Sequence, residues 1–373
     1  MKKILTLVLI ALLAIASLGV ASAEEARGEG KTIGICLTSQ ALARTVLDSI
    51  YLTEYLEEMG YDVEIVYSEQ DAAVQATQFE TFVSMGVDGI IISPSDSTAL
   101  SNAVEVAYDN EIPVMVYDAL IMNSPYIEYY ATDDLYAVGA TQGGYIVDAL
   151  GLEEGKGPFN LEIFSGSMTD NNATYFFEGA MDQLQPYIDS GMLVVKSGQV
   201  DRTSTATDKW SATNAQTRAD AILSTYYSDG THLDACLTQN DDLAAGVIAA
   251  CKSAGYGTED NPLPLTTGQD CNVSAILSII NGEQSSTVFK NIKELAYAAS
   301  VGIDAVIHDE EMPWDPEMVG SYNNNAVDVT TYQVKPLLLT AENWYELIVE
   351  SGFYDAEDLG MTEEELAAYA PAA

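Results

Sequence analysis

Amide and carboxylate side chains gather where one apolar run of this sequence stops and a helical pattern begins. The run 233–237 is followed by Gln239, Asn240, Asp241 and Asp242, with no His, Cys or Ser arranged beside them for catalysis. Amides donate and accept hydrogen bonds and carboxylates accept them, so the cluster suits an uncharged ligand rich in hydroxyl groups. We expect Asp241 to contact this ligand, with Asn240 as a less decisive neighbour. We expect Asp242 to begin a helix without touching the ligand.

The same residue types recur after other apolar runs. The cases are Asp118 after 112–117, Asp170, Asn171 and Asn172 after 159–164, and Gln269 and Asp270 after 263–267. Any one of them could instead cap a helix N-terminus, which is an equal explanation when a residue is taken singly. Their coincidence at several strand ends favours one shared site, because the carboxyl ends of parallel strands face a common crevice.

Two further residues suit a sugar, whose adjacent hydroxyl groups planar amides and carboxylates can grip. Arg44 would add a fork of hydrogen-bond donors, and Trp210 could cover the C–H face of a sugar ring. Catalytic signals are weak, because neither His232 nor His308 has a nucleophile-elbow sequence nearby. Carboxylates that share a cleft could hydrolyse a glycoside, so a secreted carbohydrate-active hydrolase stays open as the alternative. We predict no enzyme activity, no cofactor and no metal site.

Alternating strand and helix periods predict an α/β protein with two Rossmann-like lobes, each built on a parallel sheet. Four strand–helix units run from Thr32 to Tyr117, and a second set runs from Phe159 to Thr267. Later elements would pack back on both lobes, so the chain would cross between them more than once. We predict a first lobe of 32–133 plus 269–316, a second of 134–268 plus 317–354, and a frayed acidic tail, 355–373.

Composition and the N-terminal residues indicate where the protein works. Fourteen Lys and Arg against 57 Asp and Glu give a formal charge of −43, which opposes binding to nucleic acids and anionic lipids. Residues 1–23 combine Lys2 and Lys3, an apolar run and a final Ala-Ser-Ala, which is typical of a cleaved secretory signal peptide. A polar tether, 24–31, follows, and no cysteine stands there for lipid attachment. These features predict a freely diffusing periplasmic protein.

Four cysteines, Cys36, Cys236, Cys251 and Cys271, are scattered singly along the chain. A chain of this size needs no disulfide staples, so we interpret them as small buried hydrophobic residues. A bridge between Cys236 and Cys251 remains possible, because they fall on a predicted strand and the helix after it.

Several segments resemble the periplasmic sugar-binding proteins of ABC transporters. They are YDALI (117–121), YYATDD (129–134), GKGPFNLEIFSGS with DNNA (155–173), PYIDSGMLVVKSGQ (186–199), TGQD (267–270) and INGEQSSTVFK (280–290). The resemblance covers almost all of the mature chain. It is greatest to the multiple-sugar-binding and xylose-binding branch of the ribose/galactose-type family.

This resemblance implies a type I periplasmic binding protein fold, with three hinge crossings and one monosaccharide, an aldopentose or aldohexose, between the lobes. The sugar contacts it implies come from Arg44, Asp118, Asn172, Asp241 and Asp270, with Trp210 and Lys290 as further candidates. It also implies a membrane permease and its ATPase as partners of a monomeric protein, and in some relatives a chemoreceptor or sensor kinase. A sensor component without a transport role is therefore a second alternative.

Two positions depart from the family pattern. Thr45 stands where relatives usually carry an aromatic residue after the matched Arg, and Ala119 stands where they usually carry Arg after the matched Asp. These changes remove a stacking platform and a guanidinium fork from the first lobe. The sequence therefore leaves the class of sugar open.

Overall fold

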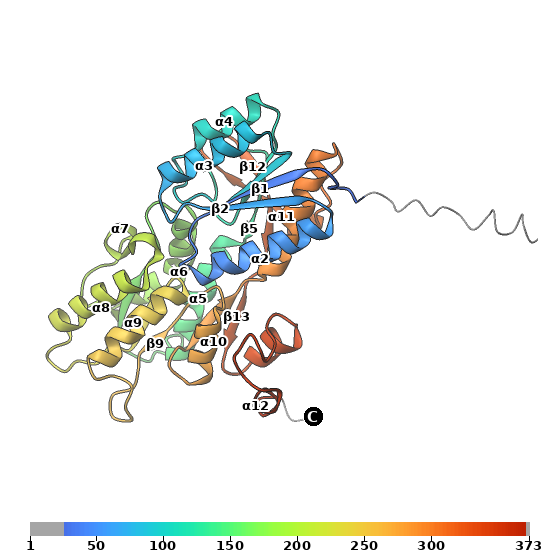
Figure 1. Cartoon of the computed structure of the whole chain (residues 1–373). Coiled ribbons are helices and arrows are strands. Elements are labelled where there is room, and N and C mark those ends of the chain that lie inside the picture. The colour runs from blue at the N-terminus through green and yellow to red at the C-terminus, as the bar shows by residue number, and fades with distance from the viewer. Residues whose placement is uncertain (1–25, 371–373) are drawn as a thin grey trace, which may run out of the picture.

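The computed structural model describes residues 26–370. The predicted signal peptide, 1–23, lies outside the described residues. Of the predicted tether, the part from residue 26 is anchored, since Arg27 pairs with Asp304 at 2.8 Å and with Glu310 at 2.9 Å. Two lobes lie one above the other, and the last part of the chain packs beside their junction (Figure 1).

The first lobe is built on a seven-stranded sheet in the order β11-β12-β5-β4-β3-β1-β2. Its strands are β1 (Thr32–Leu37), β2 (Asp62–Tyr67), β3 (Gly89–Ile92), β4 (Val114–Tyr117), β5 (Tyr129–Asp133), β11 (Val319–Asn323) and β12 (Asp328–Val334). Within this sheet every neighbouring pair is parallel except β11 with β12. Helices cover both faces, α3 (Ala72–Met85) and α4 (Ser101–Asp109) on one, α2 (Ala43–Glu58) and α11 (Ile292–Ile307) on the other.

Strand β3 shows why the short apolar runs become buried central strands. Ile90 and Ile92 point into the core under α3 and α4, whereas Ile91 points into the core under α2 and α11. Side chains alternate between the two faces of a strand, so a strand covered on both faces must be apolar at every position. All four residues of β3 are buried.

The second lobe contains a parallel sheet in the order β7-β6-β8-β9. Its strands are β6 (Phe159–Phe164), β7 (Leu193–Val194), β8 (Ala235–Thr238) and β9 (Leu265–Thr266). Its helices are α5 (Leu135–Leu150) and α6 (Asn172–Asp189) on one face, with α8 (Ala212–Tyr226) and α9 (Asp241–Ser253) on the other. A short α7 (Arg202–Thr205) and a 3-10 turn, η1 (Asp208–Trp210), precede α8. The predicted α/β class with parallel sheets is confirmed.

The predicted division of the later segments needs correction. Strands β11 and β12, assigned to the second lobe, extend the first sheet, because β12 pairs with β5 from Thr330 to Val334. Residues 269–290 were assigned to the first lobe and form α10 (Val273–Ile280) and β10 (Ser286–Phe289). β10 pairs with β13 (Leu337–Thr340), and both strands contact α5 of the second lobe, so this part of the chain belongs with the second lobe. The sequence is strand-like over 332–339, yet it does not form one continuous strand. Two strands form there because Pro336, which has no N–H, stands between β12 and β13.

The C-terminal segment is also more ordered than predicted. Beyond β13 the chain forms a π-helical segment, η3 (Tyr345–Glu350), and a capped short helix, α12 (Glu363–Ala367). Phe353, Tyr354, Leu359 and Leu366 are buried in one cluster with residues of α10 and β10, and Tyr51 of α2 packs against it. Apolar residues spaced between acidic ones therefore make a packed appendage and not a frayed tail.

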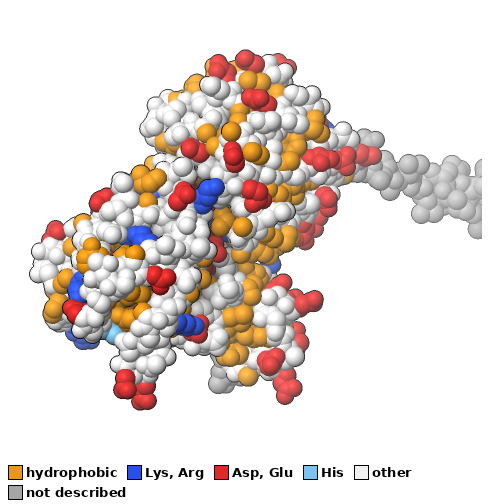
Figure 2. Space-filling view, turned by 60° about the vertical axis from the view of Figure 1, so that its left-hand side comes forward, with side chains coloured by type: hydrophobic (Ala, Val, Ile, Leu, Met, Phe, Trp, Pro, Cys, Tyr) orange, Lys and Arg blue, Asp and Glu red, His pale blue; other side chains and the backbone are white. Residues whose placement is uncertain are grey.

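All four cysteines are buried and carry free thiols, so the possible bridge between Cys236 and Cys251 is absent. Acidic side chains are spread over the visible surface and basic ones are few (Figure 2). Among residues 26–370, no helix has both the length and the apolar character needed to span a bilayer.

Candidate functional site

A cleft lined by residues of both lobes lies between them. The ends of several strands and helices supply its polar walls, as expected for the carboxyl edges of parallel sheets. Nine of the ten predicted site residues line it: Arg44, Asp118, Asp170, Asn172, Trp210, Asn240, Gln269, Asp270 and Lys290.

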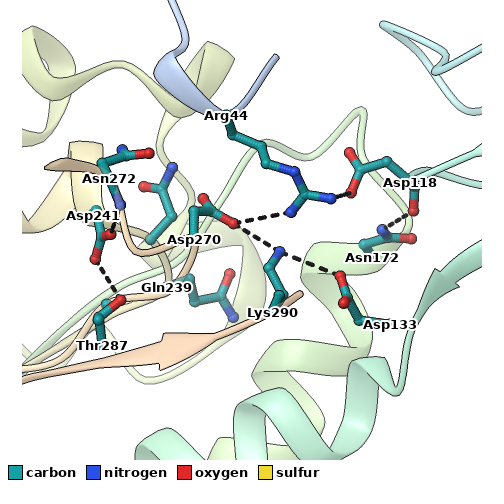
Figure 3. A network of polar contacts seen from close by, with 12 residues as sticks. Arg44, Asp118, Asp133, Asn172, Gln239, Asp241, Asp270, Asn272, Thr287 and Lys290 are labelled. Carbon is teal, nitrogen blue, oxygen red and sulfur yellow. Dashed lines mark hydrogen bonds and ion pairs between the residues drawn. The ribbon is translucent and has the colours of Figure 1, made fainter. Parts of the chain in front are cut away.

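Asp270 is the centre of a charged network on the cleft wall (Figure 3). Its Oδ1 atom lies 2.7 Å from Lys290 Nζ and 3.4 Å from Arg44 Nη1. Lys290 Nζ lies 3.5 Å from Asp133 Oδ2, and Arg44 Nη2 lies 3.5 Å from Asp118 Oδ1. The network therefore joins α2, the ends of β4 and β5, and the segments after β9 and β10.

The charges of this network sustain one another. Burial alone would raise the pKa of Asp270, but the Lys290 ammonium and the Arg44 guanidinium outweigh it and hold that pKa below its usual value. Burial likewise works to lower the pKa of Lys290, and the neighbouring Asp270 carboxylate reverses the shift, so this pKa is raised. Asp270 therefore stays ionised and Lys290 stays protonated at neutral pH.

A third carboxylate, that of Asp48, holds Arg44 behind the cleft wall. Its Nε atom donates to both oxygens of Asp48, at 2.9 and 3.1 Å, one helical turn further along α2. The Tyr117 hydroxyl donates to Asp48 Oδ1 at 2.6 Å. Burial raises the pKa of Asp48 to about 6, and the Arg44 charge opposes that shift. The guanidinium is thus fixed at one end and presents its other nitrogens to Asp118 and Asp270.

The turn after β4 fixes Asp118. Its backbone has φ of 60°, in the left-handed region that residues other than Gly seldom occupy. Its carbonyl oxygen accepts hydrogen bonds from the hydroxyls of Tyr130 and Thr132 and from Asn172 Nδ2. With the backbone held by three donors, the carboxylate points into the cleft and its side chain is 30% exposed.

Two aromatic rings form the apolar part of the cleft. Trp210 and Phe176 meet edge to face with centroids 6.4 Å apart, and Trp210 Nε1 donates to Asp170 Oδ2 at 3.1 Å. Burial, followed by repulsion from Asp118, raises the pKa of Asp170 to about 6. A Cβ atom on Gly166 would lie 2.0 Å from the Trp210 ring, so only glycine lets the indole lie against this turn.

The lobes touch each other at the cleft. The Ser97 N–H of the first lobe donates to the Thr169 carbonyl of the second at 2.9 Å, and the Asn171 N–H donates to Ser97 Oγ at 3.2 Å. Asn172 Nδ2 donates to the Asp118 carbonyl at 2.6 Å. These hydrogen bonds join the two lobes directly at the cleft.

The predictions for the start of α9 need correction. Asp241 does not line the cleft, because it points toward β10, where Thr287 and Gln284 donate to its Oδ1 atom at 2.8 and 2.9 Å. Asp242 was predicted to have no ligand contact, yet it does line the cleft. Adjacent residues of a helix point about 100° apart, so at most one of the two carboxylates can face the ligand. Asn240 lines the cleft and also caps α9, accepting from the Leu243 N–H at 2.9 Å.

The sequence reasoning missed a further group of lining residues. They are Thr38, Leu42, Gln70, Ser93, Pro94, Ser95, Ser167, Thr169 and Phe176, together with Thr45 and Ala119, which were noted only as departures. Ser93 and Ser95 directly follow β3 and Ser167 follows β6, so the strand-end signal was present there in hydroxyl form. Phe176 stands one helical turn after Asn172 on α6, which is the signal that could have found it.

The cleft offers few side chains suited to catalysis or to metal binding. His232 lies beside Asp234 and the Pro262 carbonyl, and His308 lies at the end of α11, so neither lines the cleft. Across residues 26–370 no three or more His, Cys, Asp or Glu side chains are grouped to hold a metal ion.

Comparisons with known proteins agree with this geometry. The model of the "Periplasmic binding protein domain" family matches residues 49–310. The chain is 40% identical to the "Multiple sugar-binding periplasmic receptor ChvE" of Rhizobium radiobacter, over 94% of this chain and 99% of that protein. It is 41% identical to the "Multiple sugar-binding periplasmic protein SbpA" of Azospirillum brasilense, over 87% and 89%. The chain is also similar to a crystal structure of an ABC transporter solute-binding protein from Clostridium phytofermentans with bound β-D-glucose. The two are 40% identical with a TM-score of 0.84, and the match covers 88% of this chain and 100% of that one.

Proposed function

Because this chain belongs to the periplasmic binding protein family, we propose that it binds one monosaccharide between its lobes and delivers it to an ABC transporter. The observation that carries the proposal is the network of Arg44, Asp270 and Lys290, which places fixed charged groups from both lobes on one cleft. An aldohexose such as D-glucose is the first candidate ligand, since the relative from Clostridium phytofermentans holds β-D-glucose. An aldopentose is the second.

Each wall of the cleft suits a different part of a pyranose. Asp118, Asp270 and Asp242 would accept from sugar hydroxyls, while Arg44, Lys290 and Asn172 would donate to hydroxyl and ring oxygens. Trp210 and Phe176 offer apolar faces for the C–H side of the ring. Both cations are already paired with carboxylates, so the site favours a neutral sugar over a sugar acid.

Delivery follows from closure. A ligand that contacts both lobes stabilises the closed arrangement over the open one, and a membrane partner can read that difference. The partners proposed are a membrane permease, which the closed protein meets on the outer face of the membrane, and the ATPase of that permease. A chemoreceptor or sensor kinase is a further proposed partner. The setting proposed is periplasmic.

The test is isothermal titration of the purified mature protein with D-glucose, D-galactose, D-xylose, L-arabinose, D-ribose and D-glucuronate. We expect a dissociation constant in the micromolar range or below for at least one neutral sugar, and weaker binding of the acid. The alternative, a hydrolase, is tested by incubation with labelled oligosaccharides. Release of shorter sugars would show that the protein is a hydrolase. If none of the tested monosaccharides binds, the proposed binding function is wrong.

A further inference from the structure

Asp241 is a fully enclosed carboxylate that no part of the proposed sugar contact uses. Its oxygens accept three hydrogen bonds, from Thr287 Oγ1 at 2.8 Å, Gln284 Nε2 at 2.9 Å and the Asn272 N–H at 3.0 Å. Burial raises the pKa of Asp241, and the three donors oppose that shift because they stabilise the ionised form. All three donors belong to the stretch of chain that carries Asp270 and Lys290.

The bond from the Asn272 N–H restrains the backbone beside Asp270. Asp270 has φ of 95° and Cys271 has φ of 56°, so two consecutive residues other than Gly occupy the positive region. Such conformations cost about 1–3 kcal/mol each and persist only where the surroundings enforce them. The bond from the Asn272 N–H to Asp241 Oδ2 ends this strained pair, and the bond from the Asp270 N–H to the Val288 carbonyl, 3.2 Å, begins it.

The other two bonds restrain the strand that leads to Lys290. Gln284 lies two residues before β10, and Thr287 lies within β10, three residues before Lys290. The Asp241 carboxylate thus holds two segments, the turn at Asp270 and the strand before Lys290. The side chains of Asp270 and Lys290 then meet at 2.7 Å.

Gly268 makes room for this arrangement. A Cβ atom there would lie 2.1 Å from Asp241 Oδ1 and 2.5 Å from Gln284 Nε2. The close approach of the Asp241 carboxylate to the crossing backbone therefore requires glycine at this position.

We propose that Asp241 is a positioning residue of the sugar site: its carboxylate holds the strained turn at Asp270 and the strand before Lys290 so that these two side chains meet at the cleft. It acts through them and does not touch the ligand. This inference rests on the proposed function for its effect on sugar affinity, although the positioning itself exists in the ligand-free protein.

The test compares Asp241→Asn with Asp234→Asn. Asp234 also accepts from a backbone N–H, that of Asn160 at 2.7 Å, but it stands before β8, at the end of that strand away from the cleft. For each variant we would measure the unfolding midpoint, the D-glucose affinity by calorimetry, and the amide proton and nitrogen shifts of residues 270–272 in the ligand-free protein.

We expect Asp241→Asn to weaken D-glucose binding at least tenfold and to move the Asn272 amide signal, because an amide has one acceptor oxygen where the carboxylate uses two to accept three hydrogen bonds. Asp234→Asn should leave both within error even where it lowers the unfolding midpoint. Equal losses of affinity in the two variants, or an unmoved Asn272 signal in Asp241→Asn, would overturn the proposal.

A second pair covers the case in which Asp241→Asn does not fold. Thr287→Ser keeps the hydroxyl donor to Asp241 and Thr287→Val removes it with little change in shape. We expect the serine variant to retain wild-type affinity and the valine variant to lose it; equal affinities would contradict the positioning role. If the wild-type protein binds no monosaccharide, the proposed function fails. In that case the positioning role is tested without ligand. It predicts that the Asn272 amide signal moves in Asp241→Asn, or that it differs between Thr287→Val and Thr287→Ser.

Discussion

Arg44 and Asp270 lie 226 residues apart in the sequence, and Arg44 Nη1 approaches Asp270 Oδ1 to 3.4 Å across the junction of the lobes. The same guanidinium donates through Nε to Asp48, one turn further along α2. This contact links α2, a helix of the first lobe, to the turn that follows β9 of the second lobe. A change at either residue should therefore affect closure as well as ligand contact.

We predict that Arg44→Lys weakens D-glucose binding at least tenfold although the charge is kept. Lysine has one donor group and cannot reach Asp48, Asp118 and Asp270 together, as the guanidinium does. Calorimetry measures the affinity, and Arg27→Lys, which alters an exposed arginine paired with Asp304 and Glu310, is the matched control. Wild-type affinity in Arg44→Lys would show that the fork is not used.

Trp210 should report the ligand by fluorescence. Of the three tryptophans, Trp210 lines the cleft, whereas Trp314 and Trp344 are buried in other clusters. Trp210→Phe should abolish most of the sugar-induced change in emission and weaken binding by about 1 kcal/mol or more, since part of the stacking surface and the bond to Asp170 are lost. Trp314→Phe should keep the emission change. A full change in Trp210→Phe would place the sugar away from this ring.

Much of the site could be predicted because strand-end polarity is a local signal. Asp118 follows an apolar run directly, and Asp270 and Asn172 lie three and eight residues beyond the ends of theirs. The parallel sheets bring those strand ends to one cleft. The difference between Asp241 and Asp242 could not be predicted. It depends on the rotation of α9 against β10, which neighbouring sequence does not encode.

The assignment of late segments failed for a similar reason. β11 alternates between exposed and half-buried residues and has little apolar character, so nothing local marks it as an edge strand. Its place is set by antiparallel pairing with β12, which in turn pairs with β5 about 200 residues earlier in the chain. Likewise, Leu359 and Leu366 look like isolated apolar residues in the predicted acidic tail, 355–373, until α10 and β10 provide the surface that buries them.

The Asp242 carboxylate lines the cleft, and its burial should lower the free energy of unfolding of the ligand-free protein at neutral pH. Burial, followed by repulsion from Asp270, raises the pKa of Asp242 to about 6. A carboxyl whose pKa is higher in the folded than in the unfolded protein opposes folding once it is ionised, so this cost grows from about pH 4 to 6 and is full above that window. Asp242→Asn should raise the unfolding midpoint of the ligand-free protein at pH 7.5 by roughly 2–4 °C.

The same variant should show little gain at pH 4, where Asp242 is protonated in the folded protein and about half protonated in the unfolded one. It should bind D-glucose more weakly because a carboxylate acceptor is lost. Asp96→Asn, at a half-buried loop position outside the cleft lining, controls for the general effect of replacing Asp by Asn. A gain in the unfolding midpoint of equal size at pH 4 and pH 7.5 would exclude the charge of Asp242 as its cause.

The C-terminal appendage should contribute to the stability of the whole protein. Phe353 meets Phe289 of β10 edge to face at 4.9 Å, and Lys293 at the start of α11 lies over its ring at 5.8 Å and donates to the Gly352 carbonyl at 2.7 Å. Phe353→Ala should lower the free energy of unfolding by about 3–5 kcal/mol, because it opens a cavity in this cluster. Tyr226→Ala, at a more exposed aromatic residue of α8, should change it by about 0.5 kcal/mol or less. Urea unfolding followed by circular dichroism gives both values. A loss in Phe353→Ala no larger than that in Tyr226→Ala would mean that the appendage adds nothing to the stability of the lobes.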